Sequence, residues 1–347
     1  MQVLVRADAG RELGTGHIMR CLTLLDALGA KALFVCTRMD GHLGDLVVDS
    51  GYRVHLLDVG LTQEQDAAQT AVLLGDSALV IVDHYLLDAT WEAAMPVPVM
   101  AIDDLANRVH DCAILLDQNL GRKDTDYDGL VPGDCLRLTG PHYALLRPEF
   151  AAARADALAA RTARTGAVQN VLVVMGGTDA PDATGWVIAQ LAQMDLPAGM
   201  TVTTVLGTTA PHLGAVRTAL AALPCESELL VGTNRMADLM GHSDLAIGAA
   251  GSTSWERCAL GLPTVIVVIA DNQIDGAAAL AASGAARQVA LRDTAGLKTV
   301  LDDVLLNSDS CRAMAHAAAA VADGKGAARV TGTIVSCLKT KRAHAEN

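Results

Sequence analysis

Residues 2–20 read QVLVRADAGRELGTGHIMR, an apolar run followed by a glycine-containing turn and the start of a helix-periodic segment. The apolar run Val3-Leu4-Val5 predicts a first β-strand, and His17 then occupies the first turn of a helix at the carboxyl end of that strand. Open α/β sheets bind ligands in the crevice outside the carboxyl ends of their strands. The positive end of the helix dipole disfavours imidazolium, so we expect His17 to be neutral near pH 7, as a general base must be.

The composition bounds the class of protein. A chain of 347 residues is long enough for two domains. Apolar residues make up 51% and aromatic residues only 3%, which predicts an aliphatic core with many small residues at close helix–sheet contacts. A formal net charge of −13 argues against a nucleic-acid or acidic-membrane partner, because both need a basic footprint. A phosphate ligand is compatible with this charge, since it needs only a local pocket of amides and one or two cations.

Cysteine usage and the lack of targeting signals indicate the compartment. The eight cysteines are scattered, with no Cys-x-x-Cys pair and no zinc-finger spacing, and most lie inside apolar runs. This pattern predicts buried free thiols in a reducing compartment. No basic stretch precedes an apolar core at the N-terminus, and no apolar run reaches transmembrane length. We therefore expect a cytoplasmic protein.

Short aliphatic and β-branched runs alternate with helix-periodic segments, which predicts parallel sheets built from right-handed βαβ units. Helical spacing is found over 17–29, 40–50 and 62–74. The expected strands are 2–6, 31–36, 53–57, 79–82, 98–102 and 113–116 in the first half, and 171–175, 202–206, 228–231, 244–248, 264–269 and 286–290 in the second.

The alternation breaks within residues 149–169, which are rich in Ala, Arg, Thr and Asp and carry no strand signal. We interpret residues 151–169 as a helical or extended linker between an N-terminal α/β domain, 1–150, and a C-terminal α/β domain, 170–347. Two such halves would form one large cleft between them. The final segment, 308–340, is predicted to be helical and able to pack back across the domains.

Polar side chains follow the ends of four predicted strands in the first half. A single strand-end Asp is readily explained as a helix N-cap or a turn former. Four clusters along one sheet edge instead favour a polar pocket for a hydroxylated or amidated small ligand. The clusters are Arg6 and Asp8; Asp83, His84 and Tyr85; Asp103 and Asp104; and Asp117, Gln118 and Asn119.

Two small-residue turns in the second half each follow a strand and precede a helix. They are MGGTD, residues 175–179, and GAAGST, residues 248–253. Small residues there let backbone amides face a phosphate. Glu256 lies one turn into the following helix, where a carboxylate can accept two hydroxyls of a ribose. Asn272 and Gln273 follow the next strand, again at a strand end.

Gly14 and Gly16 superficially resemble a dinucleotide-binding fingerprint, but Met19 occupies the place of its third glycine. A nicotinamide-dependent dehydrogenase is therefore a weak alternative. Glycines in such a position more often allow a tight turn or a close approach of the backbone to a ligand.

Five segments resemble one family, and they stand in the family's order within roughly residues 2–290. They are RADAGRELGTGHIMRCLTL (6–24), VDHYLLDATWE (82–92), IDDLANRVHDCAILLDQN (102–119), GPHYALLRPEF (140–150) and AIGAAGSTSWERCALGLP (246–263). The family is the UDP-sugar hydrolase of pseudaminic acid synthesis, which acts on UDP-2,4-diacetamido-2,4,6-trideoxy-β-L-altropyranose. The second half also resembles the nucleotide-binding domain of the lipid-linked-muramyl GlcNAc transferase group. That resemblance implies a GT-B fold, two Rossmann-like domains whose parallel sheets face a central cleft.

The resemblance implies that water attacks the anomeric carbon with inversion and that UDP is released, without a metal ion or a cofactor. His17 matches the general base, and Tyr85 matches a tyrosine that helps to position water or substrate. The implied partners are a small-molecule UDP-sugar and water, with no nucleic acid and no membrane. By resemblance, the substrate-binding residues include Arg147, Gly251, Ser252, Glu256, Asn272 and Gln273; the strand-end and turn arguments add Arg6, Asp8, Gly14, Gly16, Asp83 and Gly177.

Two other functions fit the same motifs. A glycosyltransferase that delivers the sugar to an acceptor would share the fold and the UDP site, but the first half shows no apolar or basic membrane-docking patch. A non-catalytic UDP-sugar-binding protein would bind its ligand without turnover.

Overall fold

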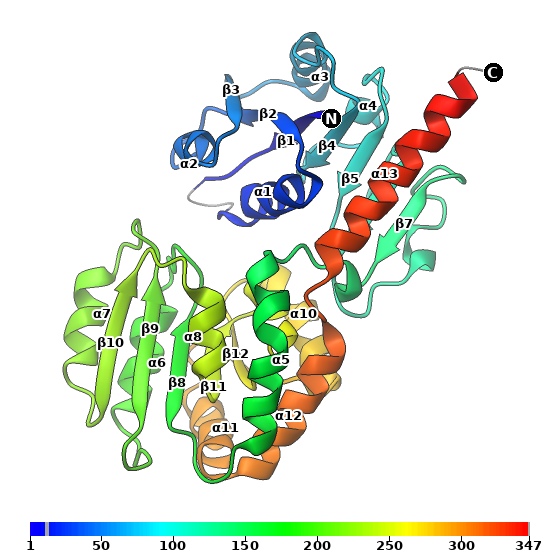
Figure 1. Ribbon diagram of the computed structural model, residues 1–347. Coiled ribbons are helices and arrows are strands. Elements are labelled where there is room, and N and C mark those ends of the chain that lie inside the picture. Colours follow the sequence, from blue (N-terminus) through cyan, green and yellow to red (C-terminus); the bar gives the residue numbers. More distant parts are fainter. Residues whose placement is uncertain (11–13, 346–347) are drawn as a thin grey trace. The chain divides into compact units, whose positions relative to one another are not determined.

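The computed structural model describes residues 1–10 and 14–345 and divides the chain into two compact units (Figure 1). Unit 1 comprises Met1–Leu146 and Lys325–Asn347, and unit 2 comprises Arg147–Gly324. Each unit contains one parallel sheet with helices on its faces, so the two Rossmann-like α/β units predicted from the sequence are confirmed. Residues 11–13, which belong to the family-like segment 6–24, lie outside the described residues.

Unit 1 has a seven-stranded sheet in the order β3-β2-β1-β4-β5-β6-β7. After β3 the chain crosses to the other side of β1, so the strand order reverses between β1 and β4. Ligands of open α/β sheets bind at such a switch point. The strands are β1 (Gln2–Ala7), β2 (Lys31–Thr37), β3 (Arg53–Leu57), β4 (Leu79–Asp83), β5 (Val99–Ile102), β6 (Ile114–Asp117) and β7 (Leu136–Thr139).

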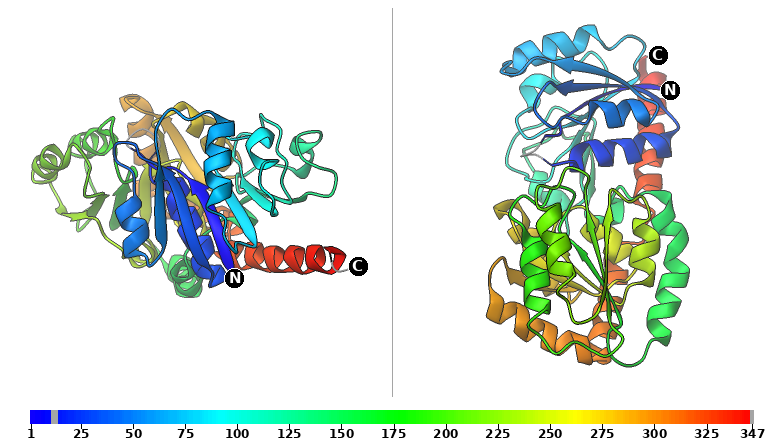
Figure 2. Two further views of the ribbon diagram at one scale, coloured as in Figure 1. Left: turned by 90° about the horizontal axis from the view of Figure 1, so that it is seen from above. Right: turned by 90° about the vertical axis from the view of Figure 1, so that its left-hand side faces the viewer.

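Helices cover both faces of this sheet (Figure 2). On one face lie α1 (Gly16–Leu28), α2 (Gly44–Asp49) and α13 (Gly326–Ala345); on the other lie α3 (Gln63–Val72) and α4 (Ala89–Glu92). Two short 3₁₀ helices, η1 (Asp124–Tyr127) and η2 (Pro141–Tyr143), lie in the connections around β7. The first helix, α1, ends where Gly29 adopts a left-handed φ of 57°, and the Gly29 N–H bonds back to the carbonyls of Asp26 and Leu25.

The C-terminal helix corrects the predicted domain boundary. We expected residues 170–347 to form one domain, but α13 belongs to unit 1. Val330 and Ile334 of α13 are fully buried in the same core cluster as Ile18 of α1. This apolar stripe completes one face of the unit 1 core, which explains why the end of the chain returns to the first domain. The helical segment predicted over 308–340 is therefore two helices in two different units.

Unit 2 has a six-stranded sheet in the order β10-β9-β8-β11-β12-β13, with its switch point between β8 and β11. Its strands are β8 (Asn170–Val174), β9 (Thr201–Leu206), β10 (Glu226–Val231), β11 (Leu245–Ala249), β12 (Thr264–Val268) and β13 (Ala286–Ala290). Both faces are again covered by helices (Figure 2). These are α5 (Pro148–Ala163), α6 (Ala183–Leu191), α7 (Leu213–Leu220), α8 (Met236–His242), α9 (Thr253–Ala259), α10 (Ile274–Ala282), α11 (Thr294–Leu306) and α12 (Ser308–Val321), with the 3₁₀ helix η3 (Asp271–Gln273) before α10.

Most of the segment interpreted as a linker, 151–169, is part of helix α5 and packs within unit 2. Arg154 donates to the carbonyls of Ala259 and Ala319, near the ends of α9 and α12. Arg161 donates to three carbonyls at the ends of α8 and α9. These arginines satisfy orphan carbonyls at helix C-termini, so the Arg-rich composition reflects capping of neighbouring helices.

All eight cysteines are free thiols, and five of them are buried. Within the described part of the chain, none of the helices combines the length and the apolar character needed to cross a bilayer.

Candidate functional site

The switch point of the unit 1 sheet brings His17 against Asp83. His17 lies in the first turn of α1, and Asp83 is the last residue of β4. Nδ1 of His17 lies 2.6 Å from Oδ1 of Asp83. Because the Asp83 carboxylate can only accept, Nδ1 of His17 carries a hydrogen and donates a hydrogen bond to Asp83. In the neutral ring Nε2 is then left with a lone pair, and it is the atom that can take a proton from water.

Arg20, one turn further along α1, holds Asp83 in place. Its Nε donates to Oδ2 of Asp83 at 2.5 Å, and its Nη2 donates to Oδ1 at 2.6 Å. Burial would raise the pKa of Asp83, but the charge of Arg20, together with His17, outweighs burial and holds that pKa below its ordinary value. Asp83 is only 1% exposed, so its contacts position His17 and do not leave it free for the substrate-binding role expected from the sequence.

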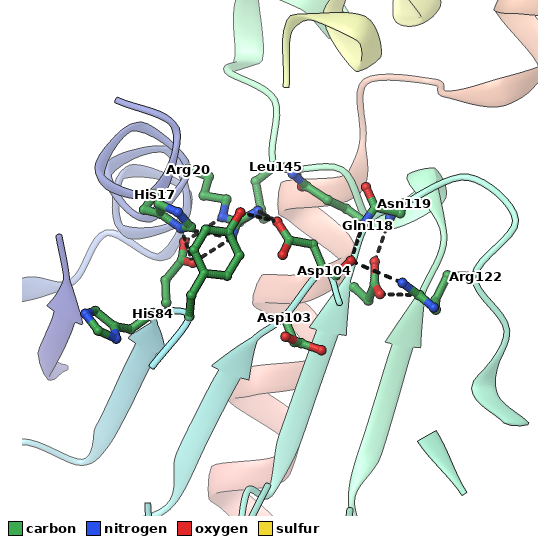
Figure 3. Close-up of polar contacts among 12 residues, drawn as sticks. His17, Arg20, His84, Asp103, Asp104, Gln118, Asn119, Arg122 and Leu145 are labelled. Atoms are coloured by element: carbon green, nitrogen blue, oxygen red, sulfur yellow. Dashed lines mark hydrogen bonds and ion pairs between the residues drawn. The ribbon is translucent and has the colours of Figure 1, made fainter. Parts of the chain in front are cut away.

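Tyr85 and Asp104 complete this cluster; Asp104 is labelled in Figure 3 together with His17 and Arg20. The ring of Tyr85 meets His17 edge-on, with centroids 4.9 Å apart, and its hydroxyl donates to Oδ2 of Asp104 at 3.2 Å. Burial and the charge of Asp104 raise the pKa of Tyr85 to about 12, so the phenol is a donor at neutral pH. Oδ1 of Asp104 is buried and has no hydrogen-bond partner among the described residues. This oxygen can accept a hydrogen bond from a ligand hydroxyl or amide.

Arg20 is not among the site residues predicted from the sequence. Its signal was its spacing, because a residue three positions after His17 lies on the same face of a helix. Arg20 also approaches Asp104, with Nη1 3.6 Å from Oδ2, so one guanidinium lies between the carboxylates of two strand ends. The same side chain therefore pairs with Asp83 beside His17 and with Asp104.

Arg6 and Asp8 lie inside unit 1, contrary to the expectation that they bind substrate. Each is only 2% exposed. Arg6 pairs with Asp8 at 2.6 Å and with Asp66 of α3 at 2.9 Å. Asp8 also accepts from the N–H of Thr37 at 2.7 Å and from Nε2 of His84 at 3.1 Å. These buried charges join β1 to β2 and α3. They neutralise one another and are not available to a ligand.

The remaining strand-end clusters are also mostly engaged within the fold. The hydroxyl of Tyr127 lies 2.8 Å from a carboxylate oxygen of Asp103 and 2.8 Å from one of Asp117. The side chain of Gln118 accepts from the N–H of Leu145 at 3.0 Å (Figure 3). Asn119 donates to the backbone carbonyl of Asp104 at 3.2 Å and so orders the loop that carries this carboxylate. Among the described residues, no group of three or more His, Cys, Asp or Glu side chains is arranged to hold a metal ion.

Gly14 and Gly16 shape the turn before α1 in different ways. Gly14 has a φ of 75° and exchanges backbone hydrogen bonds with Gly10. An L-residue with a Cβ would be strained there. Gly16 begins α1, and open space lies where its Cβ would be. Only Gly14 is therefore required by the backbone conformation.

In unit 2, two turns of small residues follow β8 and β11 at the switch point. Gly177 is exposed, and Gly251 and Ser252 are exposed in the other turn. The Ser252 side chain does not cap α9. Asp179, by contrast, is buried and accepts from two backbone N–H groups at the start of α6. Asp179 of the MGGTD segment therefore caps a helix, while Gly177 of the same segment is exposed.

Arg147 and Glu256 come together within unit 2. Nη2 of Arg147 lies 3.8 Å from Oε1 of Glu256, and its Nη1 lies 3.0 Å from Glu149. Burial outweighs the charge of Arg147 and raises the pKa of Glu256 to about 7. Asn272 is exposed in η3, and Oε1 of Gln273 accepts from the N–H of Ile269 at 3.3 Å.

The Glu256→Gln variant should gain stability over the wild type as the pH rises. A carboxyl whose pKa is raised from 4.5 to about 7 keeps in the folded state a proton that the unfolded chain releases, so its contribution to stability is lost across that range. Glutamine does not titrate. In urea unfolding, we expect the stability difference to favour the variant by about 2–3 kcal/mol more at pH 8 than at pH 5. Equal differences at both pH values would contradict the raised pKa.

The two sheets and their switch points define the class of the fold, which is the GT-B fold of glycosyltransferases. The structure of MurG from Acinetobacter baumannii matches with a TM-score of 0.71 at 17% identity, covering 96% of this chain and 99% of that one. The model of the glycosyltransferase family 28 C-terminal domain matches residues 218–330, which include Gly251, Ser252 and Glu256.

Two relatives match this chain over nearly the whole of their own length. The UDP-2,4-diacetamido-2,4,6-trideoxy-β-L-altropyranose hydrolase of Campylobacter jejuni is 28% identical over 290 residues, covering 82% of this chain and 97% of that protein. The spore coat polysaccharide biosynthesis protein SpsG of Bacillus subtilis is 25% identical, covering 95% of this chain and 97% of that protein. The resemblance to the hydrolase that the sequence motifs indicated is therefore confirmed.

Proposed function

We propose that this protein is a nucleotide-sugar hydrolase that releases UDP by inverting attack of water at the anomeric carbon. The substrate is UDP-2,4-diacetamido-2,4,6-trideoxy-β-L-altropyranose, and the free sugar serves pseudaminic acid synthesis. One observation carries the proposal: Asp83 accepts from Nδ1 of His17 at 2.6 Å, so Nε2 is the acceptor at the switch point. Similarity to the Campylobacter hydrolase supports water as the acceptor and this sugar as the donor.

In the proposed reaction, Nε2 of His17 takes a proton from water while the water oxygen bonds to the anomeric carbon. The bond from that carbon to the diphosphate oxygen breaks on the opposite face of the sugar, and UDP leaves with the bonding electrons. His17 then carries the proton, and the charge of Asp83 stabilises the imidazolium. UDP is a good leaving group, so activation of water is the larger demand on the protein.

The sugar is held in unit 1 by the groups around His17. The Tyr85 hydroxyl is a donor, and Oδ1 of Asp104 is a buried carboxylate oxygen without a partner among the described residues. An acetamido N–H or a sugar hydroxyl would satisfy that oxygen. The turn from Gly14 to Gly16 lets the backbone approach the substrate closely.

The nucleotide is held in unit 2. Ionised Glu256 accepts the ribose hydroxyls, and Arg147 beside it supplies positive charge. Small residues at the two turns let backbone N–H groups approach the diphosphate. The residues proposed to contact the nucleotide or the adjoining sugar are Arg147, Gly177, Gly251, Ser252, Glu256, Asn272 and Gln273.

The direct experiment is incubation of the purified protein with the UDP-sugar alone. We expect stoichiometric UDP and free sugar, because water is the acceptor. The His17→Asn variant, purified identically, controls for contaminating phosphatases. Release of UDP only after a sugar acceptor is added would make the protein a glycosyltransferase, and binding without release would make it a UDP-sugar-binding protein.

A further inference from the structure

A buried cation at the switch point of unit 2 has hydrogen-bond partners for only one of its three nitrogens among the described residues. Arg257 of α9 is 1% exposed. Its Nη2 donates to the carbonyl of Ala249 at 2.7 Å and to the hydroxyl of Ser254 at 2.9 Å. Within the described part of the chain, Nε and Nη1 are buried without any hydrogen-bond partner. A guanidinium has five N–H donors, so most of this donor capacity is unused.

The position of Arg257 is fixed by the two central strands. Gly248 of β11 is paired in register with Val174 of β8. A Cβ on Gly248 would lie only 2.3 Å from Nη1 of Arg257 and 2.7 Å from the carbonyl oxygen of Val174. Gly248 therefore leaves the space that the guanidinium occupies. The charge lies where the strand order reverses, which is the ligand-binding position of this class of sheet.

The two partners of Arg257 flank one exposed turn. We call residues 250–253, between Ala249 and Ser254, the β11 turn. Since Nη2 bonds to both flanking residues, the guanidinium lies at the base of this turn. Gly251 and Ser252, the exposed residues of the turn, are also those proposed to contact the diphosphate.

Arg161 is the matched case of a buried arginine with a structural role. It is 6% exposed, and its three nitrogens donate to three backbone carbonyls at 2.6–2.7 Å. Burial lowers the pKa of Arg161 to about 9 and that of Arg257 to about 10. The two guanidinium groups are therefore similarly desolvated, but only in Arg161 does each of the three nitrogens have a hydrogen-bond partner among the described residues. A purely structural role explains the hydrogen bonds of Nη2 of Arg257. It does not explain why the charge of this guanidinium is buried without compensation.

The described residues supply little counter-charge to Arg257. Glu256 is the carboxylate that acts on it, and burial raises the pKa of Glu256 to about 7. Near neutral pH the carboxyl of Glu256 is only partly ionised. Its Oε1 also lies 3.8 Å from Nη2 of Arg147, so its charge is shared between two arginines. A buried positive charge in this setting favours an anion from outside the chain.

We propose that Arg257 is a positioning residue whose buried charge attracts the diphosphate of a nucleotide bound at the β11 turn. This inference rests on the nucleotide site proposed above, and it adds the group that discriminates a nucleoside diphosphate from a nucleoside. The diphosphate contacts the β11 turn, and the charge of Arg257 attracts the diphosphate through that turn. Charges in the interior are screened far less by salt and water than charges at the surface, so the attraction survives at physiological ionic strength.

Two substitutions separate charge from bracing. Arg257→Gln keeps an N–H donor for the carbonyl of Ala249 and removes the charge. Arg257→Lys keeps the charge and loses the paired N–H donors of the guanidinium. We expect UDP affinity, measured by calorimetry, to fall roughly 10- to 100-fold in Arg257→Gln and less than about threefold in Arg257→Lys. Uridine affinity, measured by NMR titration, should change less than about twofold in both variants. The affinity for UMP should fall by a factor between those for uridine and UDP.

Arg161→Gln is the control. It should lower the melting temperature and leave the ratio of UDP to uridine affinity unchanged. If Arg257→Gln weakened uridine as much as UDP, or if Arg257→Lys lost more UDP affinity than Arg257→Gln, the residue would be a brace and the proposal would be wrong. Wild-type protein that does not bind UDP would overturn the nucleotide site itself. Wild-type protein that binds UDP but does not release it from the UDP-sugar would contradict the hydrolase proposal and leave the role of Arg257 intact.

Discussion

His17→Asn is expected to lower the turnover of UDP release by roughly 10²–10⁴-fold, the contribution of a positioned general base. Asparagine can still donate a hydrogen bond toward Asp83, but it has no basic nitrogen to take a proton from water. Because the proposed nucleotide contacts lie in unit 2, UDP affinity should change little. The measurement is steady-state UDP release from the UDP-sugar, paired with calorimetric titration of UDP.

A matched control is His55→Asn. His55 is an exposed histidine on β3, the edge strand of the unit 1 sheet, and its loss should leave turnover within about twofold of wild type. Near-normal turnover in His17→Asn would remove His17 as the base. Loss of UDP binding in the same variant would instead indicate that the substitution had disturbed more than one proton transfer.

Arg6→Met is expected to destabilise the protein by about 3–5 kcal/mol, the usual cost of breaking a buried ion pair from one side. Arg6 neutralises both Asp8 and Asp66, each of which is buried. Methionine fills much of the same volume, so the loss arises mainly from two carboxylates left without their cation. Urea unfolding of the ligand-free protein measures it.

The control is Arg38→Met, which removes an arginine from an exposed pair with Asp58 at 4.0 Å. A surface pair of this kind contributes less than about 1 kcal/mol. If Arg6→Met left stability unchanged and raised the KM for the UDP-sugar, the original expectation of a substrate-binding Arg6 would be restored.

Strands of the sheet interiors were predictable because both of their faces are buried. In β4, for example, an unbroken apolar run is covered by helices on both sides and ends at a charged residue. The edge strand β7 was not predicted. It is only four residues long, Leu136 is 42% exposed and Arg137 interrupts the apolar pattern. Edge position alone does not explain this, because the edge strand β3 was predicted over its full range, 53–57. The short and interrupted apolar pattern of β7 does.

The site was less predictable than the fold, since a strand-end charge looks the same whether it faces a ligand or the interior. Arg6 shows the difficulty, because its partner Asp66 lies 60 residues away on α3. A usable signal was the period of two along β1, which places Arg6 on the same face as Leu4. Leu4 packs in the core cluster beneath α3 and α4, so that face was never open to a ligand.

The pairing of His17 with Asp83 follows from topology together with local sequence. Neighbouring strands of a parallel sheet place their carboxyl ends side by side, and β1 pairs directly with β4. The strand order that makes them neighbours depends on a crossover that no local pattern encodes. The same holds in unit 2, where the pairing of β8 with β11 places Val174 beside Gly248 and creates the space for Arg257.

We propose that His17 activates water at the anomeric carbon of a UDP-sugar, and an NMR time course of the wild-type protein with the UDP-sugar in ¹⁸O-enriched water tests this role. We expect UDP release without an acceptor, ¹⁸O in the sugar and none in UDP, and the inverted anomer as the first product. Incorporation of ¹⁸O into the diphosphate would mean attack at phosphorus, and retention of the anomeric configuration would mean a different mechanism; either result would contradict direct attack of His17-activated water at the anomeric carbon.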